Sequence, residues 1–247
     1  MDLGFIGTGT IAAAVVTGIA GQGHGIVVSE RSKAQSARLA AQFPAVRVAP
    51  NQQVLDRSEV VFLGLLAAQA PAVLAGLRFR PGQRVVSFIA DLSLDAVATL
   101  VAPAQAVAIM LPFPAIAQGG SVILTLGDAG LIRDIFCPAN TVFEVTSQDE
   151  LRSYLCAQAV LSPAVLMVAT AADWLAGQGA DRAAGETFLR ALVASGLQGA
   201  GCRETLAALD TPGGYNQRLR QALECAGMVA ALEAGLTGLQ APRPPEP

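Results

Sequence analysis

The feature that most constrains this chain is a glycine-containing turn that begins seven residues from its start. The chain begins with a short apolar run at residues 3–6, and a G-x-G-x-x-A motif follows at 7–12. An apolar segment of helical length covers residues 11–19, and a second apolar run comes at 26–28. This order is typical of the βαβ unit that binds dinucleotides. The first thirty residues therefore predict a cofactor-binding start to the chain.

Each small residue of the motif has a physical role in such a unit. Gly7 allows the tight turn, Gly9 lets the backbone approach a pyrophosphate, and Ala12 lets the helix lie close to the sheet. The anion would then rest on free N–H groups at the positive end of the helix. The alternative is a glycine-rich turn that binds no ligand.

Apolar runs and helical segments alternate up to about residue 146. Strands are expected at residues 3–6, 26–28, 46–48, 60–65, 85–89, 106–110, 121–126 and 142–145. The segments between them have helical spacing or are short turns. This alternation predicts an α/β fold with a parallel, doubly wound Rossmann-type sheet.

From residue 149 onward the pattern predicts helices alone. Long helices are expected at residues 151–174, with a kink at Pro163, at 181–195 and at 215–239, and a short turn at 205–209. We therefore predict a dinucleotide-binding domain at 1–147 and a helical dimerisation and substrate domain at 148–240. Residues 241–247 contain four prolines in seven residues and are expected to be disordered.

The composition favours a subunit interface. Hydrophobic residues make up 53% of the 247 residues and charged residues only 14%, against a usual charged share of about 25%. Helices with so little polar surface commonly bury it in a partner, so we predict an intertwined homodimer or a higher homo-oligomer. The aromatic residues Tyr154, Trp174 and Phe188 are expected in the core or at that interface.

Other classes of function are disfavoured. The net charge of −3 and the scattered basic residues give no case for nucleic-acid binding. The most apolar stretches, 60–77 and 155–172, are interrupted by Gln and Pro, which disfavours a membrane span. Asp2 and the absence of a positive start disfavour a signal peptide, and a cytoplasmic protein is expected.

The metal-binding residue types are too few and too dispersed for a metal site. His24 is the single histidine, and it is expected to face solvent in a loop. The four cysteines share no C-x-x-C spacing and are expected to be small buried hydrophobes: Cys137, Cys156, Cys202 and Cys225. No metal is predicted.

The segment after the second strand bears on the choice of cofactor. Glu30 could bind the ribose diol of NAD, whereas hydroxyl and cationic groups could bind the 2′-phosphate of NADP: Ser29, Arg31, Ser32 and Lys33. The larger number of phosphate-binding groups favours NADP, and NAD stays possible. Alternatively, Ser32 is an ordinary N-cap of a solvated helix.

Five short motifs occur in a fixed order along nearly the whole chain. They read GFIGTGTIA, SFIADLSLDAV, IMLPFPA, LSPAV and TPGGYN, at residues 4–12, 87–97, 109–115, 161–165 and 211–216. Together they resemble pyrroline-5-carboxylate reductase, which reduces a cyclic imine acid to proline with a nicotinamide cofactor. The resemblance covers residues 3 to 239.

The sequence departs from this family around the positions that the resemblance assigns to the nicotinamide and the substrate. The family's alanine–valine–lysine–proline turn reads GLLAAQ at 64–69, without the lysine. Pro112 and Phe113 replace an asparagine and a threonine, while Tyr215 and Asn216 replace small or threonine residues. These changes leave the fold inference intact and put the substrate in question.

The resemblance implies a set of site residues. The cofactor would contact Gly7, Gly9, Thr10, Ile11, Ser29, Arg31, Ser32, Met110 and Pro114. The carboxylate of an imine acid would be held by the loop Pro212, Gly213, Gly214, Tyr215 and Asn216. Asn216 and Ser162 are the candidate catalytic residues.

Structural roles compete with two of these assignments. The 212–216 loop could be an ordinary entry into a helix with Asn216 as its cap. Ser162 could simply hydrogen-bond its own backbone beside a kink at Pro163. Neither alternative requires a ligand.

Three functions are compatible with this pattern. The first is an NADP-dependent reductase of pyrroline-5-carboxylate or a similar imine acid. The second is a reductase of the same fold that acts on another imine or on a carbonyl compound. The third is a dinucleotide-binding dimer that has lost catalysis.

Overall fold

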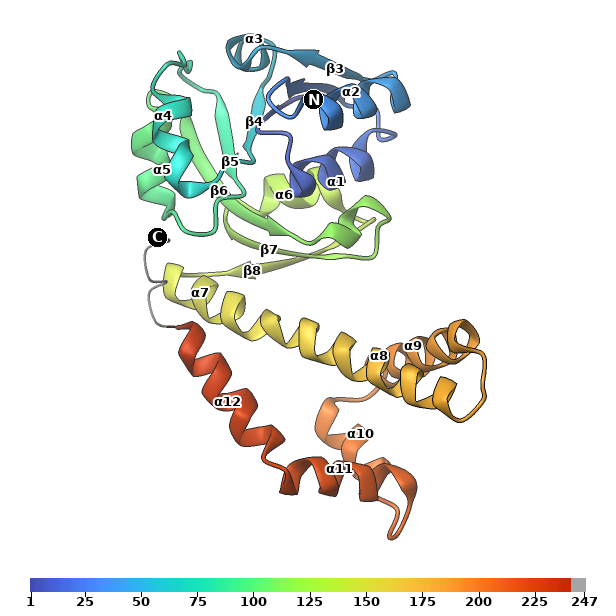
Figure 1. The fold of residues 1–247 in the computed structure, drawn as a ribbon. Coiled ribbons are helices and arrows are strands. Elements are labelled where there is room, and N and C mark those ends of the chain that lie inside the picture. Colours follow the sequence, from blue (N-terminus) through green and yellow to red (C-terminus); the bar gives the residue numbers. More distant parts are fainter. Residues whose placement is uncertain (241–247) are drawn as a thin grey trace. The chain divides into compact units, whose positions relative to one another are not determined.

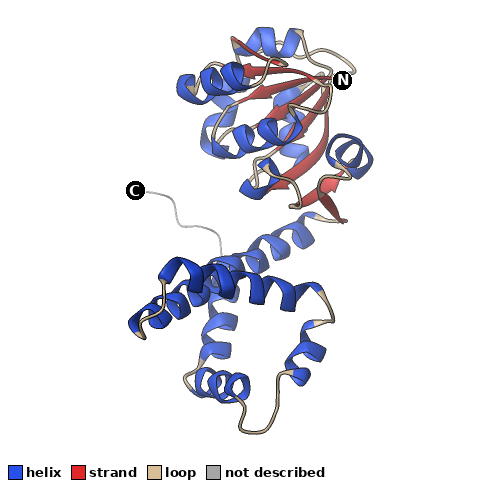
Figure 2. Cartoon of the chain, turned by 90° about the vertical axis from the view of Figure 1, so that its right-hand side faces the viewer, coloured by secondary structure: helices blue, strands red, loops and turns tan. Residues whose placement is uncertain are grey.

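The computed structural model describes residues 1–240 and divides into two compact units, Met1–Leu151 and Arg152–Pro247. The first is an α/β unit and the second is entirely helical (Figures 1 and 2). The division falls four residues beyond the boundary at 147 that the sequence predicts. The tail that we expect to be disordered, 241–247, lies outside the described residues.

The α/β unit contains one eight-stranded sheet in the order β3-β2-β1-β4-β5-β6-β7-β8. The strands are β1 Asp2–Ile6, β2 Gly25–Ser29, β3 Val46–Ala49, β4 Val60–Leu63, β5 Arg84–Ser87, β6 Gln105–Pro112, β7 Val122–Gly127 and β8 Thr141–Val145. All eight predicted strands are confirmed. Strands β1, β4 and β5 are almost wholly buried, which explains their continuous apolar runs.

The sheet is parallel except between β6 and β7, which pair antiparallel with Leu111 opposite Leu124. The prediction of a wholly parallel sheet is therefore wrong at this pair. The connection from Pro112 to Val122 contains only the short 3-10 turn η2 (Pro114–Ala117). Such a link is too short for the crossover that parallel strands require.

Helices cover both faces of the sheet. One core cluster packs α1 (Thr10–Ile19), α2 (Lys33–Gln42) and α6 (Ala129–Phe136) on one face. The other cluster packs α3 (Asn51–Asp56), α4 (Ala70–Leu74) and α5 (Leu94–Val101) on the opposite face. The unit is thus doubly wound, as predicted.

A cluster of aromatic side chains centred on Phe62 anchors the first of these cores. Its ring stacks on Phe5 with centroids 4.8 Å apart and lies 5.4 Å from Phe88 and 6.2 Å from Phe136. Phe5, Phe62 and Phe136 are fully buried. Aromatic pairs at these separations are stabilising beyond the area that they bury.

The second unit consists of helices only. The first, α7 (Gln148–Ala157), crosses the boundary between the units. It is followed by the 3-10 turn η3 (Gln158–Val160) and by α8 Leu161–Gly177, α9 Arg182–Gln198, α10 Cys202–Ala208, α11 Tyr215–Cys225 and α12 Met228–Leu239. The 3-10 turn lies just before Pro163, at the carbonyls that a proline ring displaces. The irregularity expected near Pro163 is therefore located at residues 158–160.

The predicted helix at 215–239 is two helices. The axes of α11 and α12 differ by 57° at a short break. Gly227 there has φ of +89°, a left-handed conformation that ends α11 in the manner of a glycine cap. The apolar spacing runs through the break, which is why it suggests one helix.

The helical unit has almost no core of its own. Within residues 152–240 only Cys156, Ala172 and Gly185 are buried. Large apolar side chains are exposed on every long helix, including Leu166, Leu197 and Leu219, each about two thirds exposed. The helix pairs α8–α9 and α11–α12 pack together, and other pairs of helices between residues 161 and 239 make only slight contact.

The structure changes several expectations about single residues in both units. Tyr154, Trp174 and Phe188 are exposed rather than in a core. Only Cys156 of the four cysteines is buried, so the prediction for Cys137, Cys202 and Cys225 is wrong. His24 is partly buried rather than facing solvent, and its Nδ1 atom is enclosed without a hydrogen-bond partner.

The stretch Gln148–Gly177 is also long and apolar enough to cross a membrane by length and composition. Only 11% of its most apolar window is buried within the chain. Such a helix is weak evidence for a membrane span. The same exposed surface is what a subunit interface requires.

Candidate dinucleotide site

The candidate site lies where the strand order reverses. Strand β1 pairs with β2 on one side and with β4 on the other. From β1 the chain adds β2 and β3 toward one edge of the sheet, and then β4 and β5 toward the opposite edge. In doubly wound sheets the crevice for a ligand forms outside the carboxyl ends of the two strands at such a switch point. Here those ends are Ile6 and Leu63, in register with each other.

Gly7 and Gly64 let the two loops at this point touch. Gly7 has φ of +88°, and a Cβ on it would lie 2.3 Å from the carbonyl oxygen of Gly64. A Cβ on Gly64 would lie 2.5 Å from the Gly7 oxygen and 3.2 Å from the Cβ of Ala12. The motif analysis did not single out Gly64, although a glycine directly after the buried run VVFL was a usable signal.

Gly9 borders open space. It is the N-cap of α1, with ordinary φ of −76° and no side-chain cap, and no described atom lies within 4 Å of where its Cβ would be. Thr10 and Ile11 follow as the first two helical residues. The N–H groups of this first turn have no acceptor within the helix, so the space beside Gly9 fits an anionic diphosphate.

Ser29 supports the glycine turn from beneath. Its hydroxyl is fully buried and accepts a hydrogen bond from the Gly7 N–H at 2.9 Å. Thr8, also fully buried, donates to the Ser29 carbonyl oxygen at 2.9 Å. The structure therefore places the Ser29 side chain inside the turn, where it shapes the loop instead of facing a ligand.

Arg31 and Ser32 lie at the start of α2, beyond the end of β2. Ser32 is the N-cap of α2 but its side chain makes no capping bond, so the simple capping role is not realised. The guanidinium of Arg31 is exposed and donates from Nη2 to Oε1 of Gln69 at 2.9 Å. The Ser32 hydroxyl and the remaining N–H groups of Arg31 are thus available to a phosphate at this end of the crevice.

The IMLPFPA segment divides between the core and the surface. Met110 is fully buried in β6 within the hydrophobic core, whereas Pro114 is exposed at the start of η2. The turn lies against α1, where a Cβ on Gly18 would be 2.4 Å from the Ile116 oxygen. Of the two, only Pro114 presents a surface to solvent.

The 212–216 loop forms the entry to α11. Gly213 has φ of +72°, and its N–H donates to Oε1 of Gln217 at 2.8 Å. Gly214 is the N-cap, so Tyr215 and Asn216 are the first two helical residues. Asn216 is therefore not the cap, and the backbone N–H groups of both residues are available to an anion.

The candidate catalytic side chains lie on different helices. Ser162 is exposed near the start of α8, and Asn216 is exposed near the start of α11. Neither side chain has a hydrogen-bond partner within the described residues, so the self-bonded alternative for Ser162 is not realised. Their hydroxyl and amide groups stay available to a ligand or to a second chain.

Known proteins resemble this chain in part and as a whole. Residues 2–91 match the family described as NADP oxidoreductase, coenzyme F420-dependent. No curated protein sequence matches the chain closely enough to identify a relative.

Solved structures share its complete fold at low sequence identity. Pyrroline-5-carboxylate reductase of Streptococcus pyogenes is 22% identical with a TM-score of 0.82, over 97% of this chain and 96% of that one. Pyrroline carboxylate reductase of Plasmodium falciparum, solved with NADP bound, is 13% identical with a TM-score of 0.83, over 97% and 95%.

A reductive aminase of Aspergillus terreus in complex with NADPH is 17% identical with a TM-score of 0.58, over 85% and 84% of the two chains. The similarity that the short motifs indicate thus extends to the three-dimensional structure. The chain has the fold of the pyrroline-5-carboxylate reductases, and its first ninety residues resemble an NADP-linked oxidoreductase family.

Proposed function

We propose that the protein is an NADPH-dependent reductase of a cyclic imine acid of the pyrroline-5-carboxylate class. The observation that carries this proposal is the glycine cradle at the switch point, open beside Gly9 and closed beneath by Gly7 and Gly64. The whole-chain likeness to pyrroline-5-carboxylate reductases supports the choice of substrate class.

The proposed reaction does not require a strong acid or base among the side chains. The bound dinucleotide would supply a hydride to the imine carbon, and a protonated imine is already electrophilic. The chain's own task is to hold donor and acceptor carbons at near-attack distance.

The start of α11 is suited to an acid substrate. The positive end of the helix and the N–H groups of Tyr215 and Asn216 would hold a carboxylate. The Asn216 amide would add one hydrogen bond, to the carboxylate or to the ring nitrogen. The proposal requires that this entry and a dinucleotide site meet in the assembled protein.

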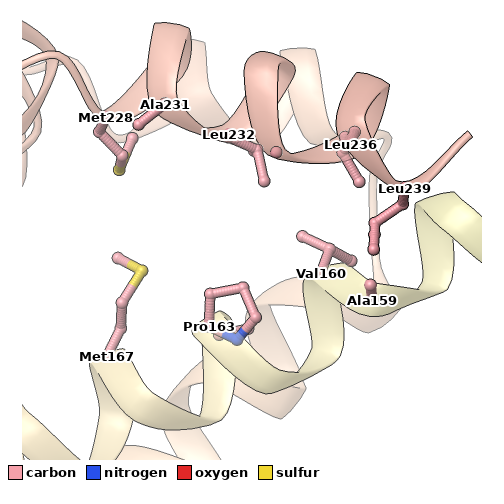
Figure 3. A pocket seen from close by; sticks show the side chains of 11 residues that line it. Ala159, Val160, Pro163, Met167, Met228, Ala231, Leu232, Leu236 and Leu239 are labelled. Carbon is pink, nitrogen blue, oxygen red and sulfur yellow. The ribbon is translucent and has the colours of Figure 1, made fainter. Parts of the chain in front are cut away.

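We further propose that the assembly is a homodimer formed by the helical unit. A groove of about 580 Å³ separates α8 from α12 and is lined only by apolar residues. Figure 3 shows Met167 and Pro163 of α8 facing Met228 and Leu232 of α12 across it. A helix of a second chain, equally apolar and equally uncovered, fits this gap.

The decisive experiment is NADPH oxidation by the full chain with pyrroline-5-carboxylate. We expect turnover in the wild type and its loss in Gly9→Val, because the new side chain would occupy the space for the diphosphate. Gly21→Val is the matched control, since Gly21 lies at the other end of α1 and also borders open space. Tight NADPH binding without turnover would reject this substrate.

A second candidate is a reductase of another imine or of a carbonyl compound. Tyr215 is 90% exposed at the entry to α11, and Phe113 adds a half-buried ring next to Pro114. Each ring adds apolar surface to its own loop, which would favour a less polar substrate. A panel of imines and ketones decides, and activity confined to pyrroline-5-carboxylate would exclude this candidate.

A dinucleotide-binding dimer without catalysis is the remaining possibility. It predicts NADPH binding with no hydride transfer to any member of that panel. A single turnover with one substrate would exclude it.

A further inference from the structure

A hydrogen bond spans the crevice at the switch point. Arg31 follows β2 and Gln69 ends the 3-10 turn η1 (Ala67–Gln69) that follows β4, and these two strands flank β1 on opposite sides. The bond from Arg31 Nη2 to Gln69 Oε1, 2.9 Å long, therefore joins the loops on the two sides of β1. It links residues 38 positions apart in the sequence.

The chemistry of the pair selects for an acceptor-rich ligand. The amide oxygen of Gln69 faces the guanidinium and accepts from it at 2.9 Å, which leaves the two N–H donors of the amide for a further partner. The guanidinium keeps four of its five N–H groups for other acceptors. Two loops thus present donors together, and a phosphate is the group that uses several donors at once.

The neighbouring carboxylate of Glu30 makes phosphate binding depend on where the Arg31 guanidinium lies. Glu30 is exposed directly before it, and a carboxylate there repels a phosphate. A guanidinium on a free side chain could turn away from the crevice or toward Glu30. The bond to Gln69 removes part of that freedom before the ligand arrives, which lowers the ordering cost of binding.

We propose that Gln69 is a positioning residue that holds Arg31 for the 2′-phosphate of NADP and so contributes to the preference for NADP over NAD. This inference rests on the proposed function, because it assumes that the crevice binds a nicotinamide dinucleotide. Gln69 acts through Arg31, and its removal should change discrimination between the two cofactors rather than binding in general.

Calorimetric titration of the full chain with NADPH and with NADH tests the proposal. We expect Gln69→Leu to weaken NADPH binding about threefold to fivefold, the scale of one exposed charge-assisted contact, and to leave NADH binding unchanged. Gln69→Glu should weaken NADPH binding at least about tenfold, because it keeps Arg31 in place but adds a charge that repels phosphate. Gln35→Leu is the matched control, since Gln35 accepts a similar exposed bond from Arg38 on α2.

A double-mutant cycle gives the signature that a general structural role would not. Arg31→Leu should abolish the preference for NADPH, and adding Gln69→Leu to it should have no further effect. An equal loss for both cofactors, no loss in Gln69→Leu, or an effect that persists without Arg31 would overturn the proposal. A wild type that binds neither dinucleotide would overturn the proposed function itself.

Discussion

The two units of this chain bury their apolar side chains very differently. The sheet of Met1–Leu151 carries helices on both faces and encloses two complete cores. In the described part of the helical unit, three residues are buried and most of the long apolar side chains are exposed. The comparison shows that the first unit encloses its apolar side chains within one chain, whereas the second leaves most of its large apolar side chains uncovered.

The difference also separates two kinds of polar interaction. In the α/β unit, buried groups such as Ser29 and Thr8 shape the cofactor turn. In the helical unit the ion pairs are exposed: Arg182 of α9 is bonded to Asp173 of α8 at 2.7 Å and to Glu186 of its own helix at 3.2 Å. Exposed pairs of this kind contribute little to stability, so they do not replace the missing core.

The largest effect is expected in the core of the first unit. Phe62→Ala removes the ring at the centre of the aromatic cluster and should lower the free energy of unfolding by about 3–5 kcal/mol. Because this core lies within one chain, the loss should not depend on protein concentration. Denaturant unfolding at two concentrations measures it, and a loss that varies with concentration would contradict the self-sufficient core.

The next effect concerns the helical unit. Met167→Glu places a charge on the apolar groove and should weaken the proposed dimer by about 3 kcal/mol, since an unpaired charge is costly to bury. Val48→Glu is the control, because Val48 is an exposed apolar residue of β3 in the other unit. Analytical ultracentrifugation should show about twice the 25.2 kDa chain mass for the wild type and for Val48→Glu.

A wild-type protein that is monomeric and still has a stably folded helical unit would contradict the proposal that this unit is covered by a second chain. Association of the helical unit with lipid vesicles, in place of a second chain, would also contradict it. This control is necessary because the stretch Gln148–Gly177 is long and apolar enough to cross a membrane. Flotation of the full chain with vesicles distinguishes the two partners.

A smaller effect is expected at the glycine cradle. Gly64→Ala places a Cβ 2.5 Å from the Gly7 backbone oxygen and should lower stability by about 1–3 kcal/mol, as overpacking does. NADPH binding should fall with it, because the two loops must separate. Gly76→Ala, where the added carbon meets open space, should leave both unfolding and cofactor binding unchanged.

The smallest effect is a dependence of stability on pH. Burial, helped by the nearby positive N-terminus, lowers the pKa of His24 below its ordinary 6.5. Since the unfolded chain then binds the proton more readily, stability is full above about pH 6.5 and falls as the pH drops toward the lowered value. His24→Gln should reduce this dependence, and a rise in stability on acidification would contradict the prediction.

The sequence predicted the α/β fold well because its strands are buried on both faces. Continuous apolar runs such as 60–63 mark such strands directly, and the glycine motif fixes the first turn. The antiparallel β6–β7 pair and the bend at Gly227 were missed, because apolar periodicity does not report strand direction or a change of helix axis. The roles of Gly64 and Gln69 were missed because each residue contacts another loop: Gly64 lies against Gly7, and Gln69 accepts a hydrogen bond from Arg31.

The candidate site was predicted less completely than the fold. Gly7, Gly9, Thr10 and Ile11 lie as the motif requires, whereas Ser29 and Met110 have buried side chains. A residue type at the right place in a sequence does not determine whether its side chain points into the crevice or beneath it. Ser162 and Asn216 lie on separate helices, as the predicted helical ranges 151–174 and 215–239 require.

The most direct test of the account is a calorimetric titration of the full chain with NADPH. We predict one binding event per chain, abolished in Gly9→Val and retained in Gly21→Val, because only Gly9 lies beside the space for the diphosphate. Failure of the wild type to bind NADPH, or equal binding by Gly9→Val, would contradict the claim that this turn holds a dinucleotide.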